Sequence, residues 1–317
     1  MRTPPLLVSF SDKKAFFAAL SQETRTSHEV EINELLEKNL PSAVSARCLA
    51  TLFGYSPKFV GSLLHKTERY YRTFVIPKGT KKRTIHAPKI GLKVIQKWLG
   101  EHLSNAIPLS PNAHGFIKNR SHITAAKVHL GAKWIYSVDI RNFFPTTPMN
   151  LIRIELEKIG YKEYAAYFIA KLCSYDGFLA QGSPASPFLS NLVFRDLDEK
   201  IAALAERLGA KYTRYADDLV FSGINDFPEE LKTVKTIIEE SGWKIAENKE
   251  RYSQSPNRLK VHGLLVHGNE IRLTKGYRNK IRIFKHLINT KRDEIQNLSV
   301  IEGHLSYSDS IDKAANE

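Results

Sequence analysis

The chain has 317 residues, and its 47 Lys and Arg against 33 Asp and Glu give a formal net charge of +14. With 42% hydrophobic and 10% aromatic residues it is not a disordered basic tail, and we expect one large buried core or two modest ones. Its two cysteines lack zinc or disulfide spacing, and no apolar run reaches the roughly 18 residues of a membrane span, so we expect a soluble, cytoplasmic protein without a signal peptide.

The first third of the chain is predicted to be mainly helical. Apolar residues recur at three- and four-residue steps over residues 10–66, which is the spacing of one helix face, with a break at Pro41. Two short extended segments follow, residues 72–77 and 83–87, and they predict a β-hairpin with a basic tip. Another helix is predicted over residues 91–106.

The rest of the chain alternates strands and helices. Residues 132–140 are rich in β-forming residues and predict a central strand, and residues 211–222 read as strand, turn and strand. No internal repeat or low-complexity linker separates the elements, so we expect interlocked subdomains. The remaining predictions are helices over residues 148–159, 163–173, 187–208, 229–241 and 275–297, and strands over residues 243–245 and 260–267.

The positive charge is confined to two segments. Residues 61–100 hold ten Lys and Arg against one acid, Glu68, whereas residues 271–292 hold eight and no acid. A single charge run is commonly a solvated face. Two runs with aromatic residues among them favour the walls of a nucleic-acid groove, because Lys and Arg hold phosphates and aromatic rings stack on bases.

Three carboxylates carry the clearest chemical signal. Tyr215-Ala216-Asp217-Asp218, called the acidic turn below, lies between two predicted strands, and Asp139 ends the predicted central strand. Adjacent acids repel each other unless a cation neutralises them, and hard divalent cations prefer carboxylate oxygens. If the strands are neighbours, the three acids can hold two Mg²⁺ for nucleotidyl transfer. Taken singly, the acidic turn is equally a solvated turn, and Asp139 an ordinary strand-end acid.

A loop between the two acidic sites relates them to a known family. Residues 181–187 read Gln-Gly-Ser-Pro-Ala-Ser-Pro. Three motifs occur in the order and spacing of the palm of reverse transcriptases. They are Asp139 followed by the aromatic pair Phe143-Phe144, this loop, and the acidic turn. The chain resembles that family over about residues 65–290.

Within the family the chain is most similar to bacterial retron reverse transcriptases. It departs from them at Ala125, where they carry Asn, and at His262, where they carry Thr. His129 and Cys173, like His262, are expected to be structural. The resemblance implies an α+β, right-hand polymerase with fingers, a palm of antiparallel sheet plus helices, and a small helical thumb. The implied domains are an N-terminal helical extension (1–64), fingers (65–130, with 148–185 contributing), palm (131–267) and thumb (268–317).

The resemblance also implies roles for individual residues. Asp139, Asp217 and Asp218 would hold two Mg²⁺ ions, and Lys249 would protonate the leaving pyrophosphate. Phe144 would form a gate against the sugar 2′-OH, so that dNTPs are preferred to NTPs. The incoming nucleotide would be contacted by Arg83, assisted by Lys81 or Lys82, and by Gln181 and Gly182. The template duplex would be contacted by Arg278, Arg282 and Lys285 in the thumb.

The activity implied is RNA-directed DNA polymerisation. Enzymes of the retron type copy part of a partner non-coding RNA into cDNA, prime from an RNA 2′-OH to give branched msDNA, and often act in anti-phage defence with an accessory effector protein. Alternatives within the family are a diversity-generating, group II intron-like or abortive-infection enzyme. A non-enzyme alternative is a helix-turn-helix DNA-binding regulator, because Ala50-x-x-x-Gly54 with Val60 matches that spacing.

Overall fold

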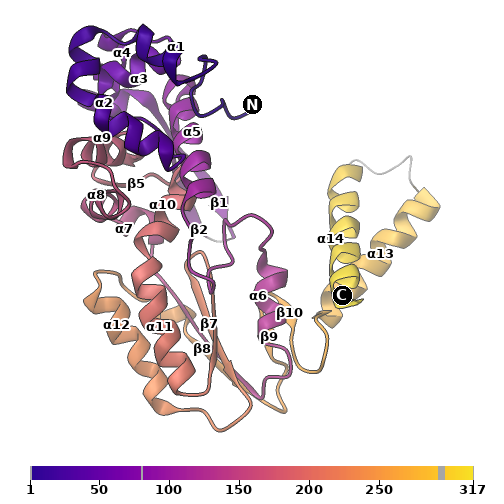
Figure 1. Cartoon of the computed structure of the whole chain (residues 1–317). Helices are drawn as coiled ribbons and strands as arrows, with labels where there is room; N and C mark the ends of the chain where they lie inside the picture. Colours follow the sequence, from indigo (N-terminus) through magenta and orange to yellow (C-terminus); the bar gives the residue numbers. More distant parts are fainter. Residues whose placement is uncertain (1, 80, 292–296, 317) are drawn as a thin grey trace. The chain divides into compact units, whose positions relative to one another are not determined.

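The computed structural model describes residues 2–79, 81–291 and 297–316, apart from the side chains of residues 78, 81, 291 and 316 (Figure 1). It contains two compact units. Unit 1 comprises Met1–Ser110 and Asn142–Asp196, and unit 2 comprises Pro111–Arg141 and Leu197–Glu317. The chain therefore passes between the units three times. Among the helices described, none is long and apolar enough to cross a membrane.

Unit 1 begins with helices whose first residues are fixed by capping side chains. Asp12, Ser21, Ser45 and Ser56 each accept a hydrogen bond from a backbone N–H of the following turn. These bonds satisfy donors that no helical carbonyl reaches. The helical prediction for residues 10–66, with its break, is confirmed. The helices are α1 Lys13–Ala19, α2 Gln22–Glu37, α3 Ala46–Phe53 and α4 Pro57–His65.

A hairpin and further helices complete unit 1. The predicted hairpin is confirmed, since β1 Tyr71–Lys78 pairs antiparallel with β2 Lys81–Pro88. Trp98 of α5 Ile90–Ala106 is fully buried, and its Nε1 donates a hydrogen bond to the carbonyl oxygen of Pro5 (3.1 Å). This bond attaches the start of the chain to α5. The other elements are η1 Thr67–Tyr70, α7 Phe143–Thr146, α8 Met149–Lys158, α9 Glu163–Cys173, β4 Ser174–Tyr175, β5 Phe178–Leu179 and α10 Ser186–Val193.

The single helix predicted over residues 187–208 is wrong, because the chain forms α10 and then α11 Arg195–Arg207. The two helices are separated at Phe194, which keeps near-helical backbone angles (φ −88°, ψ −4°). Its ring is fully buried and lies 5.7 Å from that of Phe143, centroid to centroid. Because both the backbone angles and the apolar spacing continue through Phe194, the sequence pattern contains no sign of the break.

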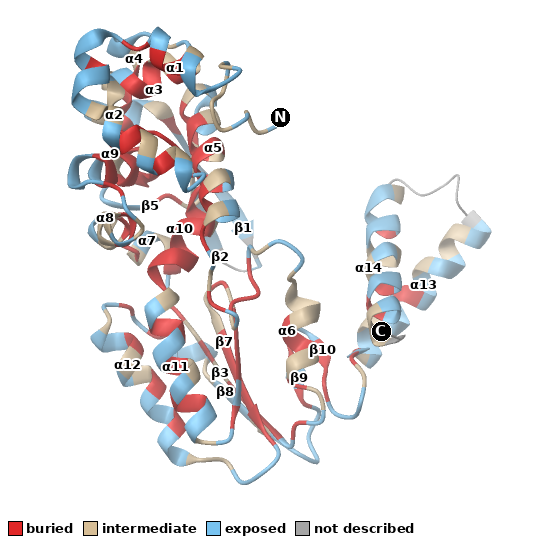
Figure 2. Ribbon diagram, viewed as in Figure 1, coloured by how far each residue is buried: buried red, intermediate tan, exposed pale blue. Residues whose placement is uncertain are grey.

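Unit 2 is built on a four-stranded antiparallel sheet. Its strands are β3 Trp134–Asp139, β6 Lys211–Tyr215, β7 Asp218–Gly223 and β8 Arg251–Gln254. The order is β6-β7-β3-β8, so β3 is a central strand as predicted. The strand, turn and strand predicted over residues 211–222 are also confirmed. Figure 2 shows that β7 is buried along most of its length, which is how an apolar central strand excludes water from the sheet.

The strand predicted over residues 243–245 is wrong. Only an isolated bridge between Ile140 and Ile245 forms there. The edge of β3 from Trp134 to Ser137 is instead paired with β8. Residues 244–246 continue along the same edge through two backbone hydrogen bonds, from the Arg141 N–H to the carbonyl oxygen of Lys244 and from the Ala246 N–H to that of Asp139 (both 2.8 Å), but they do not form a regular strand. Strand propensity alone could not show how far each segment would pair, because pairing depends on the rest of the sheet.

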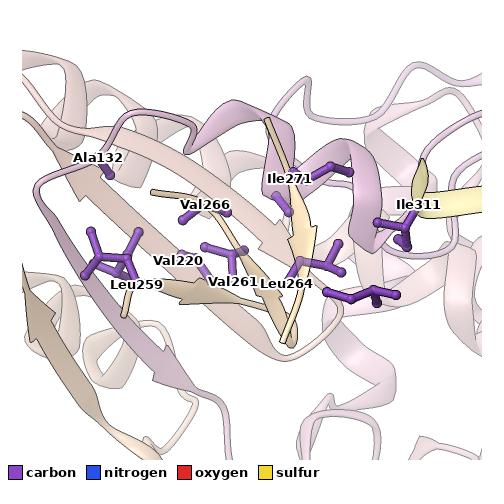
Figure 3. Close-up of a cluster of buried hydrophobic side chains, with 11 residues drawn as sticks. Ala132, Val220, Leu259, Val261, Leu264, Val266, Ile271 and Ile311 are labelled. Atoms are coloured by element: carbon purple, nitrogen blue, oxygen red, sulfur yellow. The ribbon is translucent and has the colours of Figure 1, made fainter. Parts of the chain in front are cut away.

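The C-terminal part of unit 2 contains a smaller sheet. The strand predicted over residues 260–267 is in fact a hairpin, because His262 has left-handed backbone (φ 48°) and Gly263 follows it (φ 86°). Buried apolar residues from this sheet, from β7 and from the last helix form one cluster (Figure 3). The strands, in the order β11-β10-β9, are β9 Lys260–Val261, β10 Leu264–Leu265 and β11 Arg272–Leu273.

Helices flank both sheets of unit 2. The predicted basic helix is α13 Lys275–Lys291, and residues 292–296 of that prediction lie outside the described residues. The sequence of this helix predicts an apolar face that includes Ile281 and Ile283, opposite its basic residues. Ile281 is buried, but Ile283 is 59% exposed, so the prediction for Ile283 is wrong. The predicted helix over residues 229–241 is confirmed as a 3₁₀ turn and an α-helix. The remaining helices are α6 His122–Val128, η2 Glu229–Thr233, α12 Val234–Glu240, η3 Glu247–Lys249 and α14 Leu298–Asn316.

Candidate active site

The acidic turn joins β6 to β7 in a constrained backbone conformation. Ala216 is buried and has left-handed backbone (φ 57°), which residues other than glycine rarely adopt. Gly115 approaches so closely that a Cβ placed on it would lie 2.5 Å from the backbone nitrogen of Ala216. The backbone N–H of His114 donates to the carbonyl oxygen of Arg214 (2.7 Å) and holds this segment against β6. Glycine at position 115 therefore permits the close packing of the turn.

A buried ion pair supports the acidic turn. Arg214 donates from Nε and Nη2 to the two carboxylate oxygens of Asp198 on α11 (2.9 and 2.6 Å), and neither side chain is exposed. The Nη1 of Arg214 donates to the carbonyl oxygen of Ala216 (3.0 Å). The Tyr212 hydroxyl also donates to Asp198 (2.7 Å). Because a guanidinium fork fixes both distance and direction, the turn rests on a rigid support.

β3 brings the third carboxylate to the turn. Asp139 is the register partner of Asp218 in the antiparallel pairing of β3 with β7, so the two strands are neighbours as predicted. The backbone N–H of Ile140 donates to the carbonyl oxygen of Asp217 (2.8 Å). The ammonium of Lys249 lies 2.5 and 2.6 Å from the two carboxylate oxygens of Asp139. Burial raises the pKa of Asp139, and the charges of the other two acids raise it further, against the opposing effect of Lys249.

His262 also reaches the acidic turn, which the sequence did not indicate. Its Nδ1 lies 3.1 Å from Oδ2 of Asp218, and its side chain is 8% exposed. The His262 ring packs against Tyr215 at 5.2 Å between centroids. Its Nε2 is buried and has no hydrogen-bond partner among the described residues.

The carboxylates suit a hard divalent cation. They offer only oxygen donors, and Asp139 already holds one positive charge, the Lys249 ammonium, with both of its oxygens. Within the described part of the chain, no three or more His, Cys, Asp or Glu side chains are arranged as a ready metal site. This arrangement fits Mg²⁺, which commonly binds one or two carboxylates together with substrate phosphates.

His129 and Cys173, which were expected to be structural, are both fully buried. His129 is fully buried, with Nδ1 2.7 Å from the Ser222 hydroxyl and Nε2 2.7 Å from the Thr213 hydroxyl, so it links β6 to β7. Burial lowers the pKa of His129 to about 3, which keeps the imidazole neutral. Burial raises the pKa of the Cys173 thiol to about 12, which keeps it protonated and unreactive.

The residues predicted to bind the nucleotide lie in unit 1. The carbonyl oxygen of Gln181 accepts a hydrogen bond from the backbone N–H of His86 on β2 (2.9 Å). Gly182 has a φ of 132°, and a Cβ placed on it would lie 2.8 Å from the carbonyl oxygen of His86. The close approach that this glycine permits is therefore to the backbone of β2. On the same strand Arg83 is half-buried and Lys82 is exposed, whereas the side chain of Lys81 lies outside the described set.

Phe144, the predicted gate, lies on α7 in unit 1. Its side chain is half-buried, and its ring centroid lies 5.8 Å from that of Phe143. Phe143 is itself buried. The ring of Phe144 therefore packs against that of Phe143, and part of its surface remains exposed.

The three basic residues predicted in the thumb lie along one groove. Arg278, Arg282 and Lys285 of α13 are exposed and line a groove of about 470 Å³ that β11 and α14 complete. Arg272 of β11 adds a fourth positive side chain, which pairs with Glu270 on the same groove, and Asp312 of α14 adds a second acid, so four positive charges face two negative ones. A concave surface with this excess of positive charge attracts phosphates.

Comparison with known proteins identifies the family. The sequence model described as "Reverse transcriptase (RNA-dependent DNA polymerase)" matches residues 76–296. The chain belongs to the reverse transcriptase family. It is 31% identical over 327 residues to the retron Mx65 reverse transcriptase of Myxococcus xanthus, with 93% of this chain and 75% of the relative covered. It is 32% identical over 260 residues to the retron Ec86 reverse transcriptase of Escherichia coli, with 79% of each covered. These similarities assign it to the bacterial retron branch.

A solved structure agrees with this assignment at the level of the fold. A telomerase from Candida albicans, solved with a fragment of telomeric RNA, superposes with a TM-score of 0.51 at 10% identity. The match covers 76% of this chain and 55% of the telomerase chain. The predicted α+β class of a reverse transcriptase polymerase is therefore confirmed.

Sequence reasoning missed two parts of the site. The position of His262 at the site was missed because the apolar residues around the His-Gly pair predict one continuous strand. Glycine in such a segment is also a turn signal, and it could have indicated the hairpin. Arg214 was hidden because β6 reads Lys-Tyr-Thr-Arg-Tyr, a mixed pattern in which an arginine is ordinary, and its partner Asp198 lies on a helix.

Proposed function

We propose that this chain is an RNA-directed DNA polymerase that uses Mg²⁺ at the acidic turn. The observation that carries the proposal is the register pairing of Asp139 with Asp218, beside Asp217, in a member of the reverse transcriptase family. Two bound Mg²⁺ ions would lower the pKa of the primer hydroxyl and stabilise the charge of the triphosphate. Asp139, Asp217 and Asp218 supply the negative charge that holds those ions.

We assign a proton transfer to Lys249. The Nζ of Lys249 lies within hydrogen-bond distance of both carboxylate oxygens of Asp139, at the edge of the acidic turn. The Lys249 side chain is also 42% exposed, so it can turn toward a substrate. From that position its Nζ donates a proton to the leaving pyrophosphate, which acts as a better leaving group once protonated.

We assign the binding of the nucleotide and of the nucleic acid to the remaining residues. Arg83 with Lys82 holds the triphosphate, because guanidinium and ammonium groups donate to phosphate oxygens. Gln181 and Gly182 line the nucleotide, and Phe144 excludes the ribose 2′-OH. The groove of Arg278, Arg282 and Lys285 holds the template duplex. Residues 1–64 then form an N-terminal extension, 65–130 with 148–185 the fingers, 131–267 the palm and 268–317 the thumb.

We further propose the retron type of reaction, supported by relatives that are themselves retron reverse transcriptases. The partner is a structured non-coding RNA that serves as template and, through a 2′-OH, as primer, so the product is branched msDNA. The setting is the cytoplasm and anti-phage defence, with an accessory effector. Sequencing the nucleic acid that co-purifies with the protein from its native operon tests this. A branched RNA-DNA molecule supports the retron reaction, and unbranched cDNA supports one of the other bacterial types.

The polymerase proposal is tested by Asp217→Asn. We expect primer extension on an RNA template with dNTPs to fall at least about 100-fold, because removing one charge weakens metal binding in the transition state. RNA binding measured by filter retention should persist. Asp226→Asn is the matched control, because Asp226 is exposed in the loop after β7. Unchanged extension by Asp217→Asn would show that the metal assignment is wrong.

A further inference from the structure

The turn between β9 and β10 brings an imidazole to the acidic turn in an unusual way. His262 is one of few residues other than glycine with positive φ in this chain, and at 48° it occupies the left-handed region. Among residues with a Cβ, asparagine, aspartate and histidine are the ones that most often adopt that region. The backbone conformation therefore admits several residues, and the reason for a histidine in particular must lie in its contacts.

The surroundings of His262 give that reason. Its Nδ1 lies within hydrogen-bond distance of Asp218 Oδ2 (3.1 Å), while Asp218 is 38% exposed and His262 only 8%. A buried donor aimed at a half-exposed carboxylate fixes the orientation of that carboxylate. The opposite ring nitrogen, Nε2, is buried and has no hydrogen-bond partner in the described part of the chain. A residue that served only to form a turn would not bury an unpaired polar atom.

Aromatic neighbours hold the imidazole in place. The Tyr215 ring lies 5.2 Å from that of His262, and His122 lies 6.3 Å from Tyr215 in an edge-on arrangement. Tyr307 of α14 stacks on His122 and lies within hydrogen-bond distance of its Nε2 (3.0 Å). The His262 ring therefore has restricted freedom to leave Asp218.

We propose that His262 is a positioning residue for the metal site: Nδ1–H donates to Oδ2 of Asp218 and turns the carboxylate so that its other oxygen faces the cation. Partners of this kind commonly set metal affinity, because they restrict how a ligand side chain can rotate. The inference rests on the proposed function, since Asp218 must be a metal ligand for His262 to act through it.

Three variants of the 317-residue chain separate the effect of the His262 side chain from that of the backbone conformation. His262→Gly removes the donor and relieves the positive φ. His262→Asn also suits positive φ but places an amide N–H near the position of Nδ1–H. His267→Gly makes the same chemical change at an exposed position between β10 and β11 and serves as the control.

Metal binding is the direct readout, measured by calorimetric titration with Mn²⁺ alone. We expect His262→Gly to raise the Kd for Mn²⁺ by about 10- to 100-fold and the Mg²⁺ concentration for half-maximal primer extension in parallel. His262→Asn should remain within about threefold of the wild-type Kd, and His267→Gly should be unchanged. Thermal melting confirms that each variant is folded. An unchanged Mn²⁺ Kd in folded His262→Gly, or equal losses in the Gly and Asn variants, would overturn the proposal.

A double variant separates this inference from the proposed function. If His262 acts through Asp218, adding His262→Gly to Asp218→Asn weakens Mn²⁺ binding no further than Asp218→Asn alone. Additive losses would contradict action through Asp218. If Asp218→Asn by itself left both Mn²⁺ binding and primer extension unchanged, the proposed function would fail instead, because the carboxylate would not be a ligand.

Discussion

Arg214 is a fully buried charge whose loss would leave a second charge, Asp198, buried without a counter-charge, with the Tyr212 hydroxyl as its remaining donor. Breaking such a pair from one side costs about 3–5 kcal/mol, because the remaining ion cannot regain water. We therefore expect Arg214→Met to lower the free energy of unfolding by about that amount in urea titrations. In Arg207→Met the lost ion pair with Glu230 is exposed, and the change should be at most about 1 kcal/mol. Similar losses in both variants would show that the buried pair is not a support of the fold.

The half-buried ring of Phe144 is expected to act through its size. Phe144→Ala removes the aromatic ring that is assigned to exclude the ribose 2′-OH. Incorporation of ribonucleotides relative to dNTPs should therefore rise by roughly 10-fold or more, because losing a steric clash of a few kcal/mol changes a rate ratio by at least about a factor of ten. The measurement is primer extension with each nucleotide set. Tyr167→Ala, an exposed aromatic on α9, is the control. If Phe144→Ala incorporated dNTPs normally and still discriminated against ribonucleotides as the wild type does, Phe144 would not be the gate.

At the level of elements, the closest packing lies between the segment at Gly115 and the acidic turn. A methyl group on Gly115 would meet backbone atoms of Ala216 and Tyr215, which cannot rotate away as a side chain can. We expect Gly115→Ala to displace the turn and to reduce primer extension by about 100-fold, the scale of effect of a displacement of about 1 Å. The variant should remain folded, with stability reduced by about 1–3 kcal/mol.

The control for Gly115→Ala is Gly61→Ala, because a Cβ on Gly61 in α4 would meet nothing within 4 Å. Activity should be unchanged in Gly61→Ala, and stability equal or slightly higher, since alanine favours a helix. Normal primer extension by folded Gly115→Ala would show that the acidic turn tolerates a shift.

Elements with local signals could be predicted from the sequence. The N-terminal helices carry serine and aspartate caps, and the basic hairpin and the central strand β3 have clear patterns. The carboxylates of the site were found because motif order ties them together. That β8, and not residues 243–245, forms a regular strand beside β3 could not be predicted, since pairing depends on the rest of the sheet. The hairpin at His262 was missed for a related reason, because the turn interrupts an apolar segment that otherwise reads as one strand.

At the level of the whole molecule, the basic segment of unit 2 lines the groove of α13. Arg272 there pairs with Glu270, whereas the salt bridges of the described residues include none to Arg278, Arg282 or Lys285. Binding of nucleic acid by such residues releases counterions, so affinity falls with salt in proportion to the phosphates held.

Replacing Arg278, Arg282 and Lys285 together with Gln should reduce the slope of log affinity against log salt by about 2–3, since each duplex phosphate contact contributes about 0.9. Template-RNA binding at several salt concentrations gives the slope. The control replaces Arg207, Lys232 and Lys235 with Gln, which removes the same charge from residues that are each paired with a glutamate. If both triple variants lost the same slope, the groove would have no special part in binding.

The three crossings of the chain between its units bear on how the protein is made. Asp139 belongs to the first segment of unit 2, and Asp217 and Asp218 belong to the second, with Asn142–Asp196 of unit 1 between them. During synthesis from the N-terminus, all of unit 1 is synthesised before the second group of acids exists. Unit 1 can therefore fold first, and a nascent chain acquires its complete set of carboxylates only after that unit has been made.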